Sequence, residues 1–242
     1  MMKPTLLFDY GGTLDTSATH WYYVFKAAYD QCLPQISLTD DDLRKAYVTG
    51  ERALAAAPIV MANDNFYIML TKKIAQQVSY LVASIEKFSA FNTSNLNSLI
   101  EDLATYCNEF AKKETVKSAR VLEELRNRGY KCIIVSNFYG NLHAVLNDYN
   151  LSSFFETVIE SSVVKVRKPN PTIWQLGVNA AQCEANCCIA IGDSYSKDIV
   201  PASSIGCQTI WFEGKEWEDK QYDRTVPTHI ITNLSQLLSI LL

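Results

Sequence analysis

The sequence predicts an α/β protein, with a doubly wound, Rossmann-like parallel sheet whose core is interrupted by an inserted all-helical domain. Three observations predict this fold. Short apolar runs lead into polar residues at Asp9, Ser136 and Asp193. After residue 114, strand-like and helix-like segments alternate, which is typical of β-α-β units. Between residues 17 and 113 the apolar residues recur at helical spacing, and Gly50 is the only glycine.

The core elements follow in order along the chain. The first strand is expected at 5–8, where an apolar run meets Asp9 and the turn residues Gly11 and Gly12. After the insert, a helix at 118–128 should end at Gly129, because glycine favours the position after a helix C-terminus. The sequence then predicts strands at 131–135, 157–160, 188–191, 208–212 and 229–231, helices at 141–147, 172–181 and from about 198, and an amphipathic tail at 234–241.

The insert should consist of several helices. Apolar side chains are spaced three or four residues apart around Tyr22, Phe25 and Tyr29 and again from Met69 to Ile85. Breaks are expected near Pro34, 58–65 and 91–94. We therefore assign residues 1–16 and 114–242 to the α/β core and residues 17–113 to the helical domain.

Composition narrows the partners. The 242-residue chain carries a formal net charge of -4, and its pI is near 5.4. This balance disfavours nucleic acid or an anionic membrane surface as the main partner. The seven cysteines contain no C-x-x-C pair, and Cys187 and Cys188 lie in an apolar run, so we expect buried, reduced thiols. With no secretory or membrane-spanning segment, a cytoplasmic location is expected.

Polar residues at three predicted strand ends should meet, because ligands of open α/β sheets bind outside the carboxyl ends of the strands. Asp9 is the candidate nucleophile, and the following Gly11-Gly12-Thr13 turn can direct backbone N–H groups toward an anion. Ser136 and Asn137 end another strand and can donate hydrogen bonds to phosphate oxygens. Turn capping by Asp9 and ordinary turn chemistry at Ser136-Asn137 are the alternatives.

Two further segments carry charge suited to phosphate chemistry. Asp193 and Asp198 follow an apolar strand, and paired carboxylates are ligands that Mg²⁺ prefers. Asp198 could equally be a helix N-cap. Lys168 lies in the segment VRKPNP, whose two prolines stiffen the backbone around this cation. The alternative is that Lys168 is a solvated lysine in a polar surface loop.

Together these segments resemble the motifs of the haloacid dehalogenase superfamily of hydrolases. The matching motifs are FDYGGTL at 8–14, IIVSN at 133–137, Lys168-Pro169 and GDSYSKD at 192–198. The resemblance implies that the helical insert is the cap domain of that family. It also implies that Asp9 attacks phosphorus to form an aspartyl-phosphate. Mg²⁺ would be held by Asp9, the Gly11 carbonyl, Asp193 and Asp198, the last as ligand or supporting partner, while Thr13, Ser136, Asn137 and Lys168 would hold the phosphoryl group.

One position departs from the pattern of the family's phosphatases. These enzymes carry a second Asp, the general acid/base, two residues after the nucleophile, where this chain has Gly11. Three functions remain open: a phosphatase for a small phosphorylated metabolite such as a sugar phosphate, a C–P or C–halogen cleaving enzyme, and a non-hydrolytic binder of a phosphorylated ligand. His20 and Asp15 are candidate replacement proton donors, and Lys26 is a candidate Schiff-base lysine for C–P cleavage.

Substrate specificity is expected to lie in the cap. Aromatic and basic residues of the insert could face the crevice or could belong to the cap's own core. The candidates are Tyr22, Tyr23, Arg52 and Tyr67.

Overall fold

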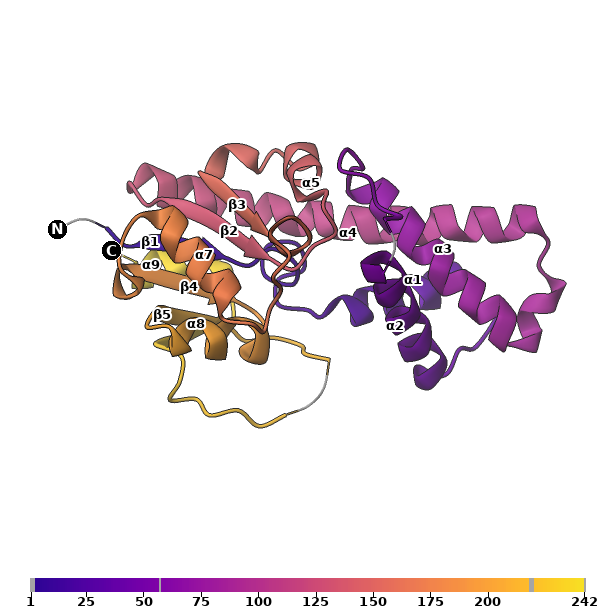
Figure 1. Ribbon diagram of the computed structural model, residues 1–242. Helices are drawn as coiled ribbons and strands as arrows, with labels where there is room; N and C mark the ends of the chain where they lie inside the picture. Colours follow the sequence, from indigo (N-terminus) through magenta and orange to yellow (C-terminus); the bar gives the residue numbers. More distant parts are fainter. Residues whose placement is uncertain (1–2, 57, 218–219, 242) are drawn as a thin grey trace.

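A computed structural model describes residues 3–56, 58–217 and 220–241, and its centre is a parallel sheet (Figure 1). Six strands lie in the order β3-β2-β1-β4-β5-β6, and every neighbouring pair is parallel. The doubly wound α/β fold that the sequence predicts is therefore confirmed. The strands are β1 (Thr5–Phe8), β2 (Cys132–Ser136), β3 (Thr157–Glu160), β4 (Cys188–Gly192), β5 (Gln208–Phe212) and β6 (His229–Ile231).

Alternate residues of the central strands pack on opposite faces of the sheet, and helices cover both faces. Leu6 and Phe8 of β1 belong to the cluster that includes α4, α5 and α9, whereas Leu7 packs with α7 and α8. Burial on both faces explains why these strands are continuous apolar runs rather than alternating ones. The core helices are α5 (Leu142–Asp148), α6 (Ser161–Val164), α7 (Thr172–Ala181), α8 (Val200–Ser204) and α9 (Leu237–Ile240), with short 3₁₀ turns at Ser152–Phe154, Ala185–Cys187 and Leu234–Gln236.

The insert is helical and extends away from the sheet, on the right of Figure 1. The helices of the insert are separated near the positions that the sequence predicts, which are Pro34, 58–65 and 91–94. The insert contains α1 (Trp21–Cys32), α2 (Asp40–Ala56), α3 (Phe66–Ser84), the 3₁₀ turn Glu86–Ala90 and the first part of α4 (Thr93–Asn127).

Helix α4 joins the two parts of the molecule. It is one unbroken helix of 35 residues that begins among the insert helices and ends against the sheet (Figure 1). The separate helix expected at 118–128 is therefore the end of a longer one, and the predicted boundary between 113 and 114 falls inside it. Its N-terminus carries a capping box between Asn92 and Asn95, and Gly129 follows it with φ of 84°, a left-handed conformation that glycine adopts without strain.

Two local expectations need correction. The helix expected to begin near Asp198 is preceded by a π-helical turn at Tyr195–Ile199, so Asp198 lies inside this turn and is not the N-cap of α8. Cys188 is buried as expected, but Cys187 is exposed because it lies in the 3₁₀ turn just before β4. All seven cysteines are free thiols. Within residues 3–56, 58–217 and 220–241, no helix has both the length and the apolar character needed to cross a membrane.

Candidate active site

The site lies at the carboxyl ends of the three central strands. Asp9 follows β1, Ser136 ends β2 and Asp193 follows β4, and β1 is hydrogen-bonded to both of the other strands. The chain crosses from β1 to β2 on one side and from β3 to β4 on the other, so this edge is the switch point of the sheet. Residues far apart in sequence thus meet because of the topology.

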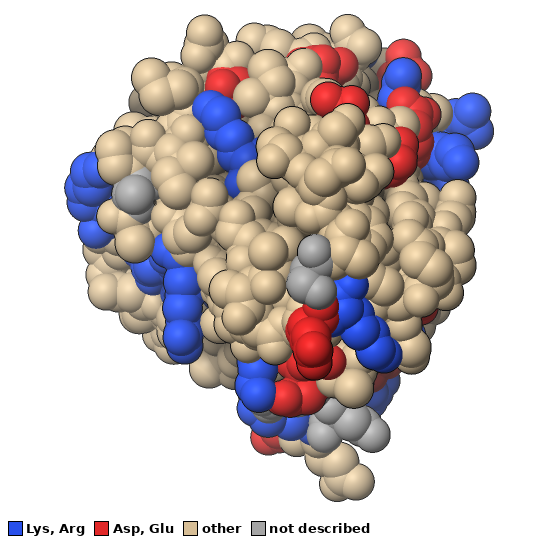
Figure 2. All heavy atoms as spheres, turned by 90° about the vertical axis from the view of Figure 1, so that its right-hand side faces the viewer, with Lys and Arg blue, Asp and Glu red and all other residues tan. Residues whose placement is uncertain are grey.

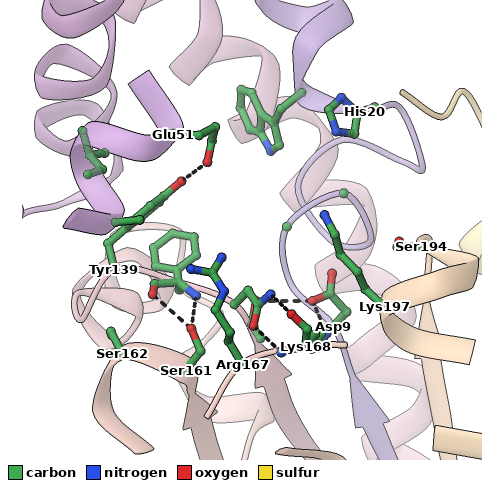
Figure 3. A pocket seen from close by; sticks show the side chains of 18 of the residues that line it. Asp9, His20, Glu51, Tyr139, Ser161, Ser162, Arg167, Lys168, Ser194 and Lys197 are labelled. Atoms are coloured by element: carbon green, nitrogen blue, oxygen red, sulfur yellow. Dashed lines mark hydrogen bonds and ion pairs between the residues drawn. The ribbon is translucent and has the colours of Figure 1, made fainter. Parts of the chain in front are cut away.

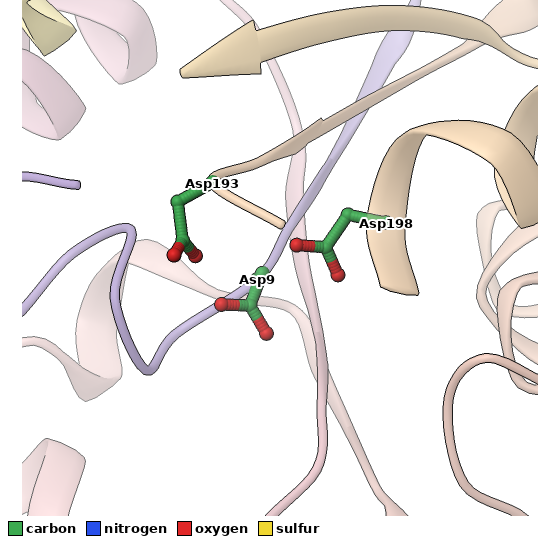
Figure 4. Close-up of side chains that lie close together, drawn as sticks. All are labelled: Asp9, Asp193 and Asp198. Carbon is green, nitrogen blue, oxygen red and sulfur yellow. The ribbon is translucent and has the colours of Figure 1, made fainter. Parts of the chain in front are cut away.

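Three carboxylates form the most charged part of the site. One oxygen each from Asp9, Asp193 and Asp198 lies within 4.8 Å of the others, with Asp9 between the two (Figure 4). Burial, followed by repulsion from Asp9 and Asp198, raises the pKa of Asp193 well above its usual value. Burial also raises the pKa of Asp198, to about 6, although Lys168 opposes the shift. Such a cluster is unfavourable without cations, and its hard oxygen donors fit a divalent ion such as Mg²⁺.

Lys168 is the cation that the structure places in this cluster. Its Nζ lies 2.6 Å from Asp9 Oδ1 and 2.7 Å from Asp198 Oδ1, and the side chain is almost fully buried (Figure 3). Burial lowers the pKa of Lys168, but the charges of Asp198 and Asp9 outweigh this effect and raise it overall. Lys168 is therefore a permanent ammonium group that holds one oxygen of Asp9.

Asn137 fixes the backbone around Lys168. Its Oδ1 accepts a hydrogen bond from Lys168 N at 2.8 Å, and its Nδ2 donates to Lys168 O at 3.1 Å. The Asn137 side chain therefore stabilises the loop that carries Lys168. Its expected contact with phosphate remains a prediction.

Two hydroxyl groups hold the Asp9 carboxylate from its other sides. Ser136 Oγ lies 3.3 Å from Asp9 Oδ1. Thr13 Oγ1 is 3.2 Å from Asp9 Oδ2 and 3.1 Å from Asp193 Oδ1, and it accepts a hydrogen bond from Asp193 N. Thr13 is fully buried among these groups, so in this structure it positions the two carboxylates. Both residues remain candidate phosphate ligands by resemblance.

Glycine is required where the backbone approaches the carboxylates. A Cβ at Gly12 would lie 2.4 Å from Asp193 Oδ2, and one at Gly192 would lie 2.4 Å from Asp198 Oδ2. Gly12 also has φ of 101°, a conformation that side chains disfavour. Gly11 is different, because nothing lies within 4 Å of a Cβ placed there. Position 11 therefore opens onto free space, and a side chain would fit there.

The two candidate proton donors, Asp15 and His20, have distinct surroundings. Asp15 is buried and accepts hydrogen bonds from Gly12 N at 2.7 Å and Trp21 Nε1 at 3.0 Å. Burial raises its pKa to about 7. His20 caps α1 by accepting from Tyr22 N, and burial lowers its pKa to about 4. His20 is therefore neutral at pH 7, with Nδ1 occupied as an acceptor, which makes it a poor proton donor.

A cavity of about 990 Å³ separates the carboxylate cluster from the insert. Of the cap residues expected to face the crevice, Tyr22 is buried in the cap's own packing, with its hydroxyl bonded to Asp40. Tyr23, Arg52, Tyr67 and Lys26 also lie outside the described lining of this cavity. The cap side of the cavity is instead formed mainly by His20, Trp21, Tyr47, Glu51, Phe66 and Lys73.

A polar cluster joins cap and core across this cavity. Lys73 of α3 donates to Glu51 Oε1 of α2 at 2.7 Å and to the Tyr139 hydroxyl at 2.8 Å. Tyr139, in the loop after β2, donates to Glu51 Oε2 (Figure 3). Although burial opposes it, the charge of Lys73 keeps the pKa of Glu51 below its usual value. The sequence alone does not predict this cluster, although a lysine on the buried face of α3 is a signal for it.

Two cations beside the motifs were also missed. Arg167 directly precedes Lys168, and Lys197 directly precedes Asp198. Both line the cavity and point up from the core toward the cap (Figure 3). Their position next to motif residues was the available signal. Elsewhere, the cap-bearing face carries interspersed positive and negative side chains around a mainly uncharged centre (Figure 2).

Comparison with known proteins identifies the family to which this chain belongs. A model described as haloacid dehalogenase-like hydrolase matches residues 3–206. The chain therefore belongs to the haloacid dehalogenase-like hydrolase family. A solved structure with a similar fold is the putative hydrolase YfnB from Bacillus subtilis, with a TM-score of 0.58, 19% identity and coverage of 100% of this chain and 99% of that one.

The chain matches curated relatives over part of its length. The chain is 34% identical over 118 residues to the bovine haloacid dehalogenase-like hydrolase domain-containing protein 3, covering 48% of this chain and 47% of that protein. It is 32% identical over 144 residues to glyceraldehyde 3-phosphate phosphatase of Pyrococcus furiosus (57% and 59%). It is 26% identical over 164 residues to pyrophosphatase PpaX of Bacillus velezensis (64% and 73%). The chain spans about half the length of the first two relatives.

Proposed function

We propose that this protein is a Mg²⁺-dependent phosphatase that cleaves a small phosphorylated metabolite through an aspartyl-phosphate on Asp9. The observation that carries the proposal is the convergence of Asp9, Asp193 and Asp198 within 4.8 Å of one another, beside the ammonium of Lys168. The proposed nucleophile, the proposed divalent-cation ligands and the proposed phosphate-binding cation thus lie next to one another. This set is the one that phosphoryl transfer to a carboxylate requires.

Each residue has a defined task in this proposal. Asp9 attacks phosphorus with a carboxylate oxygen, while Lys168 and Ser136 hold its Oδ1 and Thr13 holds its Oδ2. Asp9, the Gly11 carbonyl, Asp193 and Asp198 would hold Mg²⁺, which when bound neutralises the repulsion between carboxylate and phosphate. Thr13, Ser136, Asn137 and Lys168 are the proposed phosphate-holding set. The cap limits access of water to the cavity and selects the substrate.

The relatives support the phosphatase over the two alternatives. Two of them are named as phosphate-releasing enzymes, a glyceraldehyde 3-phosphate phosphatase and a pyrophosphatase. Cleavage of a C–halogen bond has no evident use for a cluster of three carboxylates. C–P cleavage through Lys26 is disfavoured because this lysine lies outside the described lining of the cavity and near Asp40. The expected partner is a small phosphorylated metabolite, such as a sugar phosphate, in the reducing cytoplasm that suits seven free thiols.

The test is hydrolysis of p-nitrophenyl phosphate with and without Mg²⁺. Wild type is expected to release phosphate only with the metal, and Asp9→Asn should abolish this activity because an amide is not a nucleophile. Asp148→Asn, an exposed acid at the end of α5, is the matched control and should retain activity. Metal-independent turnover, or turnover by Asp9→Asn, would contradict the proposal. Mg²⁺-dependent phosphate binding without turnover would favour the non-hydrolytic binder.

A further inference from the structure

Some cations that line the cavity have no carboxylate partner among the described residues, although the acids Asp15, Asp193 and Glu216 line it as well. Lys168 faces Asp9 and Asp198, and Lys73 faces Glu51. Four other cations line the same cavity, and for three of them no acidic side chain of the described part of the chain lies within ion-pair distance. These three are Lys165, Arg167 and Lys197.

Arg167 and Lys197 flank the nucleophile from two separate loops. Arg167 follows α6, and Lys197 lies in the π-helical turn after β4, yet both point into the space above Asp9 and Lys168 (Figure 3). Neither side chain makes a hydrogen bond to another described residue. Both are solvent-exposed, so they are free to bind an anion that enters the cavity. A substrate with a negative group next to its reacting phosphoryl group would meet both cations.

The absence of an acidic side chain at Gly11 bears on which group of the substrate Arg167 and Lys197 would bind. An alkyl phosphate releases an alkoxide, which needs a proton as it departs, and the glycine supplies none. A phosphoanhydride releases a phosphate or carboxylate, which is stable as an anion. Cations that contact the departing group stabilise the charge that develops on it. The lack of an acid at position 11 and the presence of Arg167 and Lys197 therefore both favour a substrate whose departing group is a stable anion.

We propose that Arg167 and Lys197 bind the departing group of the substrate and that the preferred substrates are phosphoanhydrides, with diphosphate or acyl phosphate linkages. The proposal rests on the proposed phosphatase function and narrows it to a substrate class. It separates this chain from enzymes that act on alkyl phosphates such as glycerol 3-phosphate. In this proposal, the anion that Arg167 and Lys197 bind is the departing group of the substrate.

The steps balance without an external acid. An Asp9 oxygen forms a bond to phosphorus while the bridging P–O bond breaks, and the electron pair of that bond leaves on the departing oxygen. From hydrogen diphosphate, the departing group is hydrogen phosphate. Water then attacks phosphorus, the bond to Asp9 breaks, and its electron pair returns to the carboxylate. Both protons of the water leave on the released dihydrogen phosphate.

The test compares five substrates with Mg²⁺ by kcat/KM. Diphosphate carries a second anion next to its reacting phosphoryl group, acetyl phosphate releases acetate, and p-nitrophenyl phosphate has a good leaving group with no second anion. Glycerol 3-phosphate and 3-phosphoglycerate have poor leaving groups, the latter with a remote carboxylate. We expect the two anhydrides to exceed p-nitrophenyl phosphate by at least about tenfold and glycerol 3-phosphate to be slowest. Preference for 3-phosphoglycerate would overturn the proposal, because the cations would then bind a remote anion.

Variants connect the preference to the two cations. Arg167→Ala and Lys197→Ala should each lower kcat/KM for diphosphate by about 10- to 100-fold, the effect of losing one charge-assisted hydrogen bond. Hydrolysis of p-nitrophenyl phosphate should fall less, since that substrate carries no second anion before its P–O bond breaks. Arg120→Ala, an exposed arginine on α4 outside the described lining of the cavity, is the matched control and should change neither. Equal losses on both substrates would overturn the proposal.

A binding measurement separates this inference from the proposed function. Imidodiphosphate, which is not hydrolysed, should raise the Tm of wild type more than inorganic phosphate does, with Mg²⁺ present in both cases. The double variant Arg167→Ala/Lys197→Ala should lose this difference. If no substrate is hydrolysed but the difference is present and lost in the variant, the phosphatase fails and the anion site stands. If imidodiphosphate and phosphate act equally on wild type, the anion site is overturned.

Discussion

Asp9 and Gly11 lie two residues apart in the turn after β1, and the chemistry of the site depends on both. Asp9 is held by Lys168, Ser136 and Thr13, so its orientation is fixed before a substrate arrives. Gly11 contributes no side chain and leaves open space at the point where an acid/base would stand. In the proposed mechanism, this arrangement therefore favours attack on phosphorus over protonation of the leaving group.

Restoring the acid at position 11 is expected to change the leaving-group preference. Gly11→Asp should raise kcat/KM for glycerol 3-phosphate by up to about 10²–10⁴-fold, the usual contribution of general acid–base catalysis, because the side chain fits without a clash. Steady-state phosphate release measures the effect. Gly11→Asn, which has the same size and no exchangeable acid, is the control. Equal rates in both variants would contradict an acid/base role for position 11.

The buried carboxyl of Asp15 should make stability depend on pH. Its pKa is raised to about 7 in the folded protein, above the usual value of 3.8. The stability that it contributes is therefore fully present below pH 3.8 and is lost as pH rises to about 7. Relative to Asp15→Asn, the metal-free wild type should lose up to about 4 kcal/mol of unfolding free energy across this range. Urea unfolding at successive pH values measures this, and a constant difference between the two proteins would contradict it.

At the scale of elements, two short segments position the charged groups. The π-helical turn Tyr195–Ile199 directs Asp198 back toward Lys168, where its Oδ2 also accepts from Ser194 N. Such turns often occur at functional sites. The loop after β2 links the proposed phosphate-holding segment to the cap through Tyr139, Glu51 and Lys73. Core and cap are thus connected by a polar cluster next to the cavity.

Removal of the Tyr139 hydroxyl should loosen this connection. Tyr139→Phe leaves Glu51 and Lys73 with one partner fewer, and we expect a loss of about 1–3 kcal/mol in unfolding free energy. A double-mutant cycle with Glu51→Gln, followed by urea unfolding, should give a coupling energy above about 0.5 kcal/mol. The control is Tyr195→Phe, which deletes a tyrosine hydroxyl bond to Asp223 O within the core. Additive effects of Tyr139→Phe and Glu51→Gln would show that the cluster does not act as a unit.

At the scale of the whole molecule, the sequence predicts most of the framework. Buried parallel strands appear as continuous apolar runs, so all six strands and the edge where Asp9, Ser136 and Asp193 meet can be predicted. The continuous helix α4 could not be predicted, because its sequence carries no signal for where cap packing changes to core packing. Lys73 and Arg167 were missed for another reason, since their roles depend on contacts between segments that only the fold brings together.

Metal binding should stabilise the whole chain. The three crowded carboxylates repel one another in the metal-free protein, and a bound divalent ion removes this repulsion. At about 100 times its Kd, Mg²⁺ should add about 2.7 kcal/mol, which corresponds to a Tm increase of several degrees. Asp193→Asn should abolish the metal-induced shift, and Asp148→Asn should retain it. An equal shift in the wild type and Asp193→Asn would place the ion elsewhere.

The measurement that most directly tests the central claim is acid quenching of the enzyme during turnover, followed by mass spectrometry of its peptides. With no acid/base at Gly11 to activate water, the phosphorylated enzyme should accumulate, and the phosphate should be on the peptide that contains Asp9. Gly11→Asp should reduce the trapped fraction, and Asp9→Asn should show none. Steady phosphate release with no phosphate trapped on the Asp9 peptide would contradict the account.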